Sequence, residues 1–573
     1  MDFFSEVTKV GESKFETEKY AFMTDYTRWS HPHDIDNRYT RKVAYFSMEF
    51  AIHQALKTYS GGLGFLAGSH MRSAFELRQD MIGIGILWKY GYYDQERNED
   101  QTMRVQFQKK YYSFLEYSGI TVRVDVNNHS VVVKAMVLKP EIFGTVPMYF
   151  LTTDVPENDH LARTITRMLY DPEPMARIAQ SIVLGVGGAK VVDALGGADI
   201  YHMNEAHALP LAFHLYDRFR GNVNEVRKHI AFTTHTPEKA GNEEHDIHLL
   251  DRMGFFNNTR LEEVREITGM HALMFNHTLA ALRLSKVANG VSQLHGEVAR
   301  TMWYDNEGVC EIKAITNAQN IPFWMDKSLR NALEKDDDGA LLRRKGEMKQ
   351  RLFEIVANQT GKLFRPEVLT LVWARRFAAY KRADLLLRDI NRFFRMVNSA
   401  EQPVQVIWAG KPYPFDHGAV SVFNKLVKAA YKQSNVAVLT GYELDLSRHL
   451  KHGADIWLNT PRRPREASGT SGMTASMNGA VNFSIQDGWI PEFARHGENC
   501  YVIPVVDTTL PDHVQDDQDY DNMMSILENE IIPTYYHNKE KWTKLMKQSM
   551  RDVTPYFNSD RMAHEYYEKM YNY

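Results

Sequence analysis

Residues 42–77, KVAYFSMEFAIHQALKTYSGGLGFLAGSHMRSAFEL, contain the pattern that decides the fold. The stretch begins with a short apolar run, residues 42–47, which predicts a buried strand. It ends with the helical spacing of residues 67–77, and a glycine-rich turn, residues 61–64, lies between the two. Such a turn can bring backbone N–H groups at a helix start toward a ligand, but it is more often only a tight turn. The stretch therefore predicts a strand–turn–helix unit of an α/β sheet.

The same alternation continues along the chain. Short apolar runs, each followed by a polar loop, occur at residues 198–203, 229–233, 369–373, 404–408, 435–439 and 455–458. Helical segments separate them, which is typical of mainly parallel sheets covered by helices. Residues 119–155 instead alternate apolar and polar side chains and predict a β insertion. We expect an α/β protein with two Rossmann-like, doubly wound lobes and a site in the cleft between them, since ligands bind at the carboxyl ends of parallel strands.

Composition narrows the function classes. The 573 residues carry 68 Lys and Arg against 72 Asp and Glu, a net charge of −4, so no polybasic surface for nucleic acid or membranes is expected. Only Cys310 and Cys500 occur, and the His-rich segments 31–34 and 244–248 lack a metal-binding spacing, so no metal is expected. Residues 1–6 lack the basic start of a secretory signal. We expect a cytoplasmic protein without a membrane segment.

Reactive side chains gather in loops after the predicted strands. Residues 204–207 (NEAH) and 234–237 (THTP) each place a histidine at a strand end. A lone histidine is more often a structural residue, but His235 is the stronger catalytic candidate because ligands bind at that edge of a sheet.

Cationic side chains follow the first strand of the second lobe. Arg376 and Lys381 lie in the run 375–382 and can converge on one anion, for which phosphate is the natural choice. The segment 469–472 (GTSG), with the hydroxyls of Thr470 and Ser471 and accessible amides, predicts a second wall for the same anion.

Glu466 lies beside these anion-binding groups, where a carboxylate needs another partner. The hydroxyls of a sugar are one choice, since a polyol that satisfies a buried acceptor is bound selectively. A salt bridge to Arg462, Arg463 or Arg465 is an equally good interpretation of the sequence.

Together, these motifs resemble the α-glucan (glycogen and maltodextrin) phosphorylase family, particularly its shorter bacterial and archaeal branch. The matching segments are VAYFSMEFAIHQALKTYSGGLGFLAG (43–68), HMNEAHA (202–208), FTTHTPEKAG (232–241), VSQLHGEVARTMW (291–303), ITN (315–317), ARRFAAYKRADLLL (374–387) and DIWLNTPRRPREASGTSGM (455–473). They occur in the family's order through most of the chain.

The resemblance implies a GT-B fold and retaining transfer of glucosyl units between an α-1,4-glucan and phosphate. It implies an N-terminal domain over residues 1–320, a second domain over 321–535 and C-terminal helices over 536–573 that pack back on the first. Phosphorylase relatives also suggest a homodimer, by analogy only.

The resemblance also implies site residues. Arg376 and Lys381 match the substrate-phosphate ligands, and Gly62 the backbone contact of the glycine turn. His235 matches the histidine whose main-chain carbonyl contacts the reacting glucose. The implied glucose-site residues are His207, Asn317, Glu466, Ala467, Ser468 and Gly469, and Tyr442 and Thr470 resemble neighbours of the family's pyridoxal phosphate.

One position departs from the family. Its members carry the cofactor lysine after the methionine of the last motif, whereas this chain has Thr474 there, and residues 475–488 contain no lysine. A hydroxyl cannot form a Schiff base, so pyridoxal phosphate is expected to be held non-covalently or to be absent. Three hypotheses remain: a phosphorylase with an altered cofactor, a cofactor-independent transferase that uses a nucleotide sugar, and an inactive glucan-binding protein.

Overall fold

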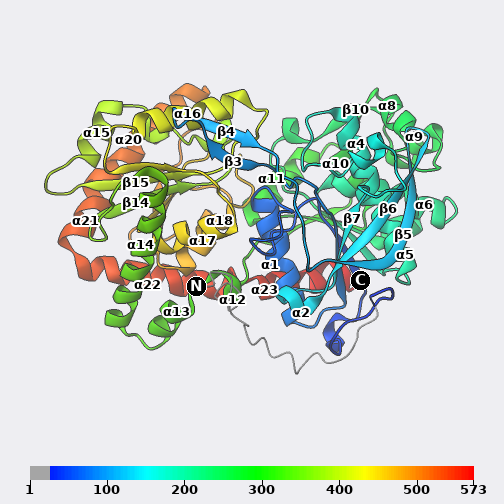
Figure 1. Ribbon diagram of the computed structural model, residues 1–573, viewed down its shortest axis with the longest axis horizontal. Helices are drawn as coiled ribbons and strands as arrows, with labels where there is room; N and C mark the ends of the chain where they lie inside the picture. Colours follow the sequence, from blue (N-terminus) through cyan, green and yellow to red (C-terminus); the bar gives the residue numbers. More distant parts are fainter. Residues whose placement is uncertain (1–25) are drawn as a thin grey trace, which may run out of the picture.

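The computed structural model describes residues 26–573 and contains two large sheets (Figure 1). Residues 1–6, on which the expectation about a secretory signal depends, lie outside the described part. The first sheet has nine strands in the order β13-β12-β9-β8-β1-β2-β7-β6-β5. Its strands are β1 (Val43–Phe46), β2 (Met81–Ile86), β5 (Glu116–Val126), β6 (His129–Leu138), β7 (Met148–Thr152), β8 (Ile200–Asn204), β9 (Ile230–Thr233), β12 (Val287–Gly290) and β13 (Glu311–Ala314).

The first sheet is parallel from β13 to β7 and antiparallel at its far edge. The strands predicted over residues 119–155 form as β5, β6 and β7, and β6 pairs antiparallel with both neighbours. They extend the main sheet, because β7 pairs in parallel with β2. The four-residue strands β1, β9 and β12 are buried along their whole length, which explains their short, mostly apolar runs.

The second sheet has six strands, and every neighbouring pair is parallel. Its order is β16-β15-β14-β17-β18-β19, so the direction of strand addition reverses between β14 and β17. The strands are β14 (Leu369–Ala374), β15 (Val404–Ala409), β16 (Val436–Leu439), β17 (Ile456–Asn459), β18 (Val481–Ile485) and β19 (Cys500–Ile503). A reversal of this kind leaves the loops after β14 and β17 at a position where parallel sheets bind ligands.

Helices cover both sheets (Figure 1). We call the part of the molecule that contains the nine-stranded sheet the first half, and the part that contains the six-stranded sheet the second half. The helices of the first half include α1 (Gly62–Glu76), α2 (Pro140–Phe143), α3 (His160–Arg163), α4 (Pro174–Ile182), α5 (Gly188–Ala194), α6 (Pro210–Arg218), α7 (Val223–His229), α8 (Ile247–Met253), α9 (Leu261–Thr268), α10 (His277–Leu284) and α11 (Gln293–Trp303). The helices that follow are α12 (Ile321–Trp324), α13 (Lys327–Glu334), α14 (Asp338–Thr360), α15 (Ile390–Val397), α16 (His417–Ala430), α17 (Leu444–Gly453), α18 (Thr470–Met477), α19 (Ile490–Phe493), α20 (Asp512–Ile526) and α21 (Ile532–His537).

The last two helices, α22 (Lys539–Tyr556) and α23 (Ser559–Tyr566), run along both halves of the molecule. In α22, Ser549 hydrogen-bonds Ser476 of α18 at 3.0 Å, and in α23, Ser559 hydrogen-bonds Ser73 of α1 at 2.6 Å. The N-cap of α23 is Asn558, whose side chain accepts from the backbone N–H of Asp560.

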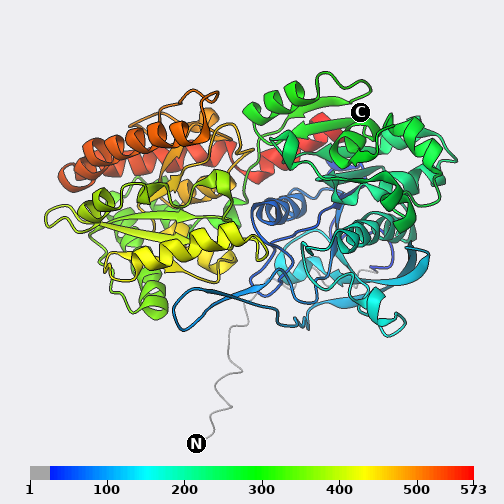
Figure 2. The same cartoon turned by 90° about the horizontal axis from the view of Figure 1, so that it is seen from above.

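A hairpin of the first half reaches across to the second (Figure 2). It consists of β3 (Asp94–Arg97) and β4 (Met103–Gln106). Gln95 donates a 2.9 Å hydrogen bond to the carbonyl of Gly410, and Tyr93 donates one of 2.8 Å to the carbonyl of Pro412. Both contacts fix the loop after β15 against the first half.

One continuous helical stretch, residues 174–194, is long and apolar enough to cross a membrane by length and composition. Most of its apolar window (78%) is buried inside the protein. It therefore has the character of a core helix that packs on the first sheet.

Gly410 lies where a side chain cannot fit. Its φ is +152°, and a Cβ there would lie 1.9 Å from the backbone oxygen of Arg375. We predict that Gly410→Ala lowers the free energy of unfolding by about 2 kcal/mol or more, because the β14–β15 loops must shift. The control is Gly346→Ala on α14, where nothing lies within 4 Å and alanine favours the helix by about 0.5–1 kcal/mol. Equal stabilities of the two variants in urea unfolding would contradict this.

Candidate active site

A cavity of about 410 Å³ lies between the two halves of the molecule. Loops after β1, β8 and β9 form one wall, and loops after β14 and β17 form the other. Every site residue predicted from the sequence lines it except Thr474; the lining set includes Gly62, His207, His235, Asn317, Arg376, Lys381, Tyr442, Glu466, Ala467, Ser468, Gly469, Thr470 and Ser471. The fold thus brings together residues that are up to 471 − 49 = 422 positions apart in the chain, from Glu49 to Ser471.

The cationic end of the cavity is organised around Glu466. Lys381 Nζ lies 2.7 Å from Glu466 Oε2, and Arg375 Nη1 lies 4.0 Å from the same oxygen. The alternative salt bridges do not form: Arg462 pairs with Asp516 at 2.7 Å, and Arg465 pairs with Glu238 at 2.5 Å. Glu466 therefore does have a basic partner, but it comes from the β14 loop and not from the residues beside it in sequence.

Arg376 is the free cation of this group. Within residues 26–573, no side chain or carbonyl pairs with its guanidinium, which is exposed to the cavity. Arg375 differs, since it is buried and donates to Asn459 and to the carbonyl of Leu458 at 3.1 Å. An unpaired guanidinium beside a lysine has the chemistry of a site for phosphate or another oxyanion.

Burial and charge compete at Glu466. Burial raises the pKa of a carboxyl group, but Lys381 and Arg375 outweigh it and hold the pKa of Glu466 below its usual value. The backbone N–H of Glu466 donates at 2.8 Å to Asp487, whose own pKa is raised to about 7, chiefly by burial. The carboxylate of Glu466 is thus ionised near neutral pH and can accept hydrogen bonds from a ligand.

The histidine wall is held by the loops after β8 and β9. His235 Nε2 lies 2.7 Å from Asn204 Oδ1, and its backbone N–H donates to Glu205. Burial is the main cause that lowers the pKa of His235 to about 3, and the nearby His295 and His207 lower it further. The ring is therefore neutral. A neutral, half-buried ring fits a positioning role better than proton transfer at neutral pH.

Glu205 carries backbone strain in this wall. Its φ and ψ are 70° and 166°, a region that costs a residue other than glycine about 1–3 kcal/mol. Burial raises the pKa of its carboxyl group to about 7, and the carboxylate caps the N–H groups of Ala206 and His235. Sequence reasoning placed Glu205 in a reactive loop without giving it a role, because its backbone conformation is not visible in the sequence.

Glu49, which follows β1, fixes the glycine turn. It accepts from the backbone N–H groups of Ser60 at 2.7 Å and Gly61 at 3.0 Å, and from the Tyr170 hydroxyl at 2.6 Å. These bonds satisfy the turn N–H groups before Gly62 and leave the start of α1 directed at the cavity. This contact joins two loops that are eleven and twelve residues apart in sequence, and it forms only when the chain folds.

Several buried polar atoms around the cavity have no partner within the described residues. They are His207 Nδ1, Asn242 Oδ1, Asn317 Oδ1, Ser468 Oγ and Arg375 Nε. Buried polar atoms normally have a partner, so these atoms are available to hydrogen-bond a polar ligand in the cavity. Ala467 joins the two halves beside it, because its carbonyl accepts from Ser292 Oγ at 2.7 Å.

The region around Thr474 is closed. Its side chain is 1% exposed and donates to the carbonyl of Ser471 at 3.0 Å. Gly469, Thr470 and Ser471 form the start of α18 at the cavity, but Thr474 lies one turn further along the helix and does not line it. Tyr442 lines the cavity and donates weakly, at 3.4 Å, to the carbonyl of Ala374.

Comparison with known proteins agrees with this site. The family description "Carbohydrate phosphorylase" matches residues 277–502. A maltodextrin phosphorylase of Thermococcus litoralis is 32% identical over 96% of this chain and 72% of its own length. A glycogen phosphorylase of Aquifex aeolicus is 30% identical over 99% of this chain and 92% of its own length. An uncharacterized protein of Methanocaldococcus jannaschii is 48% identical over 93% of this chain and its own entire length.

The fold and the cavity define an α/β protein with two large, mainly parallel sheets and a cationic cavity between them. The chain belongs to the carbohydrate phosphorylase family, as the matches over nearly its whole length show.

The free guanidinium predicts anion binding. Arg376→Met is expected to weaken orthophosphate binding about 10- to 100-fold, the value of one or two charge-assisted hydrogen bonds, and to leave the melting temperature of the unliganded protein almost unchanged. Isothermal titration calorimetry measures the first effect and calorimetric unfolding the second. The control is Arg462→Met, which removes a cation already paired with Asp516 and should not weaken phosphate binding. Equal phosphate affinities of wild type and Arg376→Met would remove Arg376 from the site.

Asp487 predicts a pH dependence of stability. Its pKa is about 7 in the folded protein and 3.8 ordinarily, so between these values the unfolded chain has released a proton that the folded chain retains. Raising the pH through this window therefore favours unfolding, by about 2–4 kcal/mol in total from this group. Asp487→Asn should flatten the fall in stability between about pH 4 and 7, as measured by urea unfolding at several pH values. An unchanged slope in the variant would show that Asp487 ionises normally.

Proposed function

We propose that the protein is a retaining glucosyltransferase that moves glucosyl units between an α-1,4-glucan and phosphate. The observation that carries this proposal is the unpaired guanidinium of Arg376 beside the Lys381–Glu466 pair, in a cavity with unsatisfied polar atoms. A phosphate needs the first feature, and a sugar with several hydroxyl groups needs the second. Membership of the phosphorylase family supports the same reaction.

In this proposal the two sheets are the Rossmann-like halves of a GT-B fold. The order β16-β15-β14-β17-β18-β19 supports this for the second half, because it is the 3-2-1-4-5-6 order of a doubly wound sheet. The domains would then extend over residues 1–320 and 321–535, with residues 536–573 packing back on the first. A cytoplasmic location and a homodimer remain predictions from the sequence.

In phosphorolysis, one group of cavity residues binds the phosphate and another group binds the glucose that is transferred. Arg376 and Lys381 bind phosphate and stabilise its charge as it attacks the glucosyl carbon. Hydrogen phosphate itself carries the proton that the departing glucan oxygen needs, so the products are a shortened glucan and glucose 1-phosphate. Glu466, Asn317 and Ser468 hold the hydroxyl groups of the transferred glucose, and the loop of His235 positions it.

Thr474 supports a second candidate, transfer from a nucleotide sugar. The chain offers no lysine at the family's cofactor position, and the same cations could stabilise a departing diphosphate. A protein that only binds glucan is the third possibility, and it differs from both in having no turnover.

The proposal predicts phosphate-dependent release of glucose 1-phosphate from maltooligosaccharides, with retention of the α-configuration. Glu466→Gln should lower kcat/KM by about 100-fold, because a buried charged acceptor for the glucose is lost and Lys381 is left unpaired. Coupled assays and NMR of the anomeric proton measure both. Turnover with nucleotide sugars and none with phosphate would select the second candidate. Glucan binding without either turnover would select the third.

A further inference from the structure

Lys451 of α17 is buried without a polar partner. Its side chain is 1% exposed, and no residue of the described part accepts a hydrogen bond from it or pairs with it. The Nζ atom instead lies 3.8 Å from the centroid of the Trp324 ring and 5.2 Å from that of Phe65. Burial, then the positive charges of Arg448 and Arg375, hold the pKa of Lys451 well below its ordinary value.

Other buried lysines of the second half do have partners. Lys345 donates to the carbonyls of His452 at 2.7 Å and Asn478 at 2.8 Å, and Lys349 pairs with Asp455 at 2.6 Å. Hydrogen bonds thus account for the burial of these amines, as they normally do. Lys451 is distinguished by its surroundings, which are aromatic rings.

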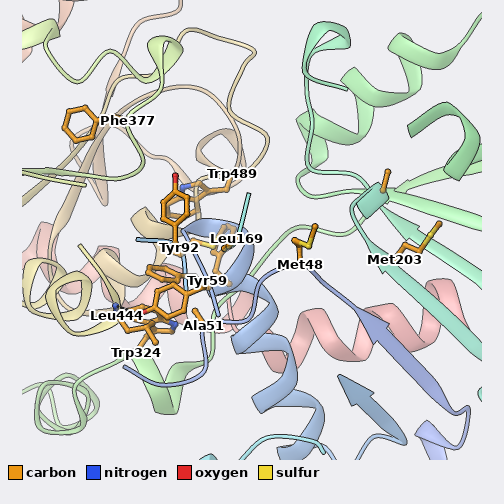
Figure 3. Packing of buried hydrophobic residues seen from close by; sticks show 14 of the residues in the cluster. Met48, Ala51, Tyr59, Tyr92, Leu169, Met203, Trp324, Phe377, Leu444 and Trp489 are labelled. Atoms are coloured by element: carbon orange, nitrogen blue, oxygen red, sulfur yellow. Dashed lines mark hydrogen bonds between the residues drawn. The ribbon is translucent and has the colours of Figure 1, made fainter. Parts of the chain in front are cut away.

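Helix α18, which carries Thr474, packs against α12 and α17, which carry Trp324 and Lys451. Asn478 donates to the carbonyl of Thr474 at 2.8 Å and to the carbonyl of Trp324 at 2.9 Å, so α12 and α18 are joined at this point. The Phe65 and Trp324 ring centroids are 5.4 Å apart. Beyond them, the Tyr59 hydroxyl accepts from the backbone N–H of Leu444, and Figure 3 shows Tyr59, Leu444 and Trp324 gathered together.

This packing decides whether the family's cofactor fits. A ring tethered to residue 474 must lie within one side-chain length of it, on the side that faces the cavity. The described cavity ends at Phe65, Thr470 and Ser471, and neither Thr474 nor Lys451 lines it. Phe65, Trp324 and Lys451 are each 6% exposed or less, so side chains fill the space behind that wall. The residues present therefore do not fit a pyridoxal ring.

We propose that Lys451 fills, from within the chain, the space beside Thr474 that a pyridoxal ring would need, so that the protein has no pyridoxal phosphate site. The glucosyl transfer proposed above then depends on the cations of the cavity alone. Only this last statement rests on the proposed function; the absence of a pyridoxal phosphate site does not. Restoring the lysine at position 474 is not sufficient to recruit the cofactor, because the space stays occupied.

The experiment reads cofactor binding and not activity, so its failure is distinguishable from failure of the proposed function. The folded protein is titrated with pyridoxal phosphate, reduced with borohydride and mapped by peptide mass. Wild type and Thr474→Lys should stay colourless and carry no reduced adduct in the segment 444–477. Thr474→Lys combined with Lys451→Ala should bind the cofactor and carry the adduct at position 474.

The matched control is Thr474→Lys combined with Lys451→Met, which removes the amine but keeps the volume of the side chain. It should stay colourless like Thr474→Lys alone. Lys451→Met by itself should melt no lower than wild type, because it replaces an amine without a partner by an apolar chain of similar length.

An adduct at position 474 in Thr474→Lys with Lys451 intact would overturn the proposal, as would an adduct on Lys451 in wild type. A folded Thr474→Lys, Lys451→Ala protein that stays colourless would also overturn it, since Lys451 would then not be what closes the space. If both double variants bind the cofactor equally, the volume of residue 451 is irrelevant and the proposal is wrong.

Discussion

The contact between Lys381 and Glu466 is the interaction on which the site depends. It joins the loop after β14 to the loop after β17, the two neighbouring strands at which the second sheet reverses its order. With Lys381 and Arg375 directed at one carboxylate, Arg376 is left as the cation that faces the cavity without a partner in the described chain. Because Glu466 stays ionised, a carboxylate acceptor and an unpaired guanidinium lie in the same cavity, as the proposed binding of a sugar and a phosphate requires.

The first half supplies the opposite wall of the cavity, and hydrogen bonds from backbone N–H groups to two carboxylates hold that wall in place. Glu49 holds the glycine turn by its N–H groups, and Glu205 holds the N–H groups of its own loop and of His235. In both cases a carboxylate fixes main chain by accepting hydrogen bonds from backbone N–H groups. The strained conformation of Glu205 is the energetic cost of placing that wall. The hairpin β3–β4 and the contact from Ser292 to Ala467 then keep the two walls together.

Much of this arrangement could be predicted from the sequence, for identifiable reasons. Short, mostly apolar runs predicted the parallel strands, because a strand buried on both faces has few polar positions. The residues that line the cavity followed from motifs at strand ends. The partner of Glu466 could not be predicted, because Lys381 becomes its neighbour only when β14 and β17 pair. Lys451 was missed for a similar reason: it lies in α17, before the motif, and only tertiary packing places it near Thr474.

The central claim is that an oxyanion binds at Arg376 inside the cavity between the two halves. The most direct measurement is an anomalous difference map from crystals soaked with arsenate, a phosphate analogue that scatters strongly, together with a maltooligosaccharide. The account predicts a single strong peak within hydrogen-bonding distance of the Arg376 guanidinium, beside Lys381 and next to the sugar held by Glu466. A peak elsewhere with an empty Arg376, or a sugar bound away from Glu466, would contradict it.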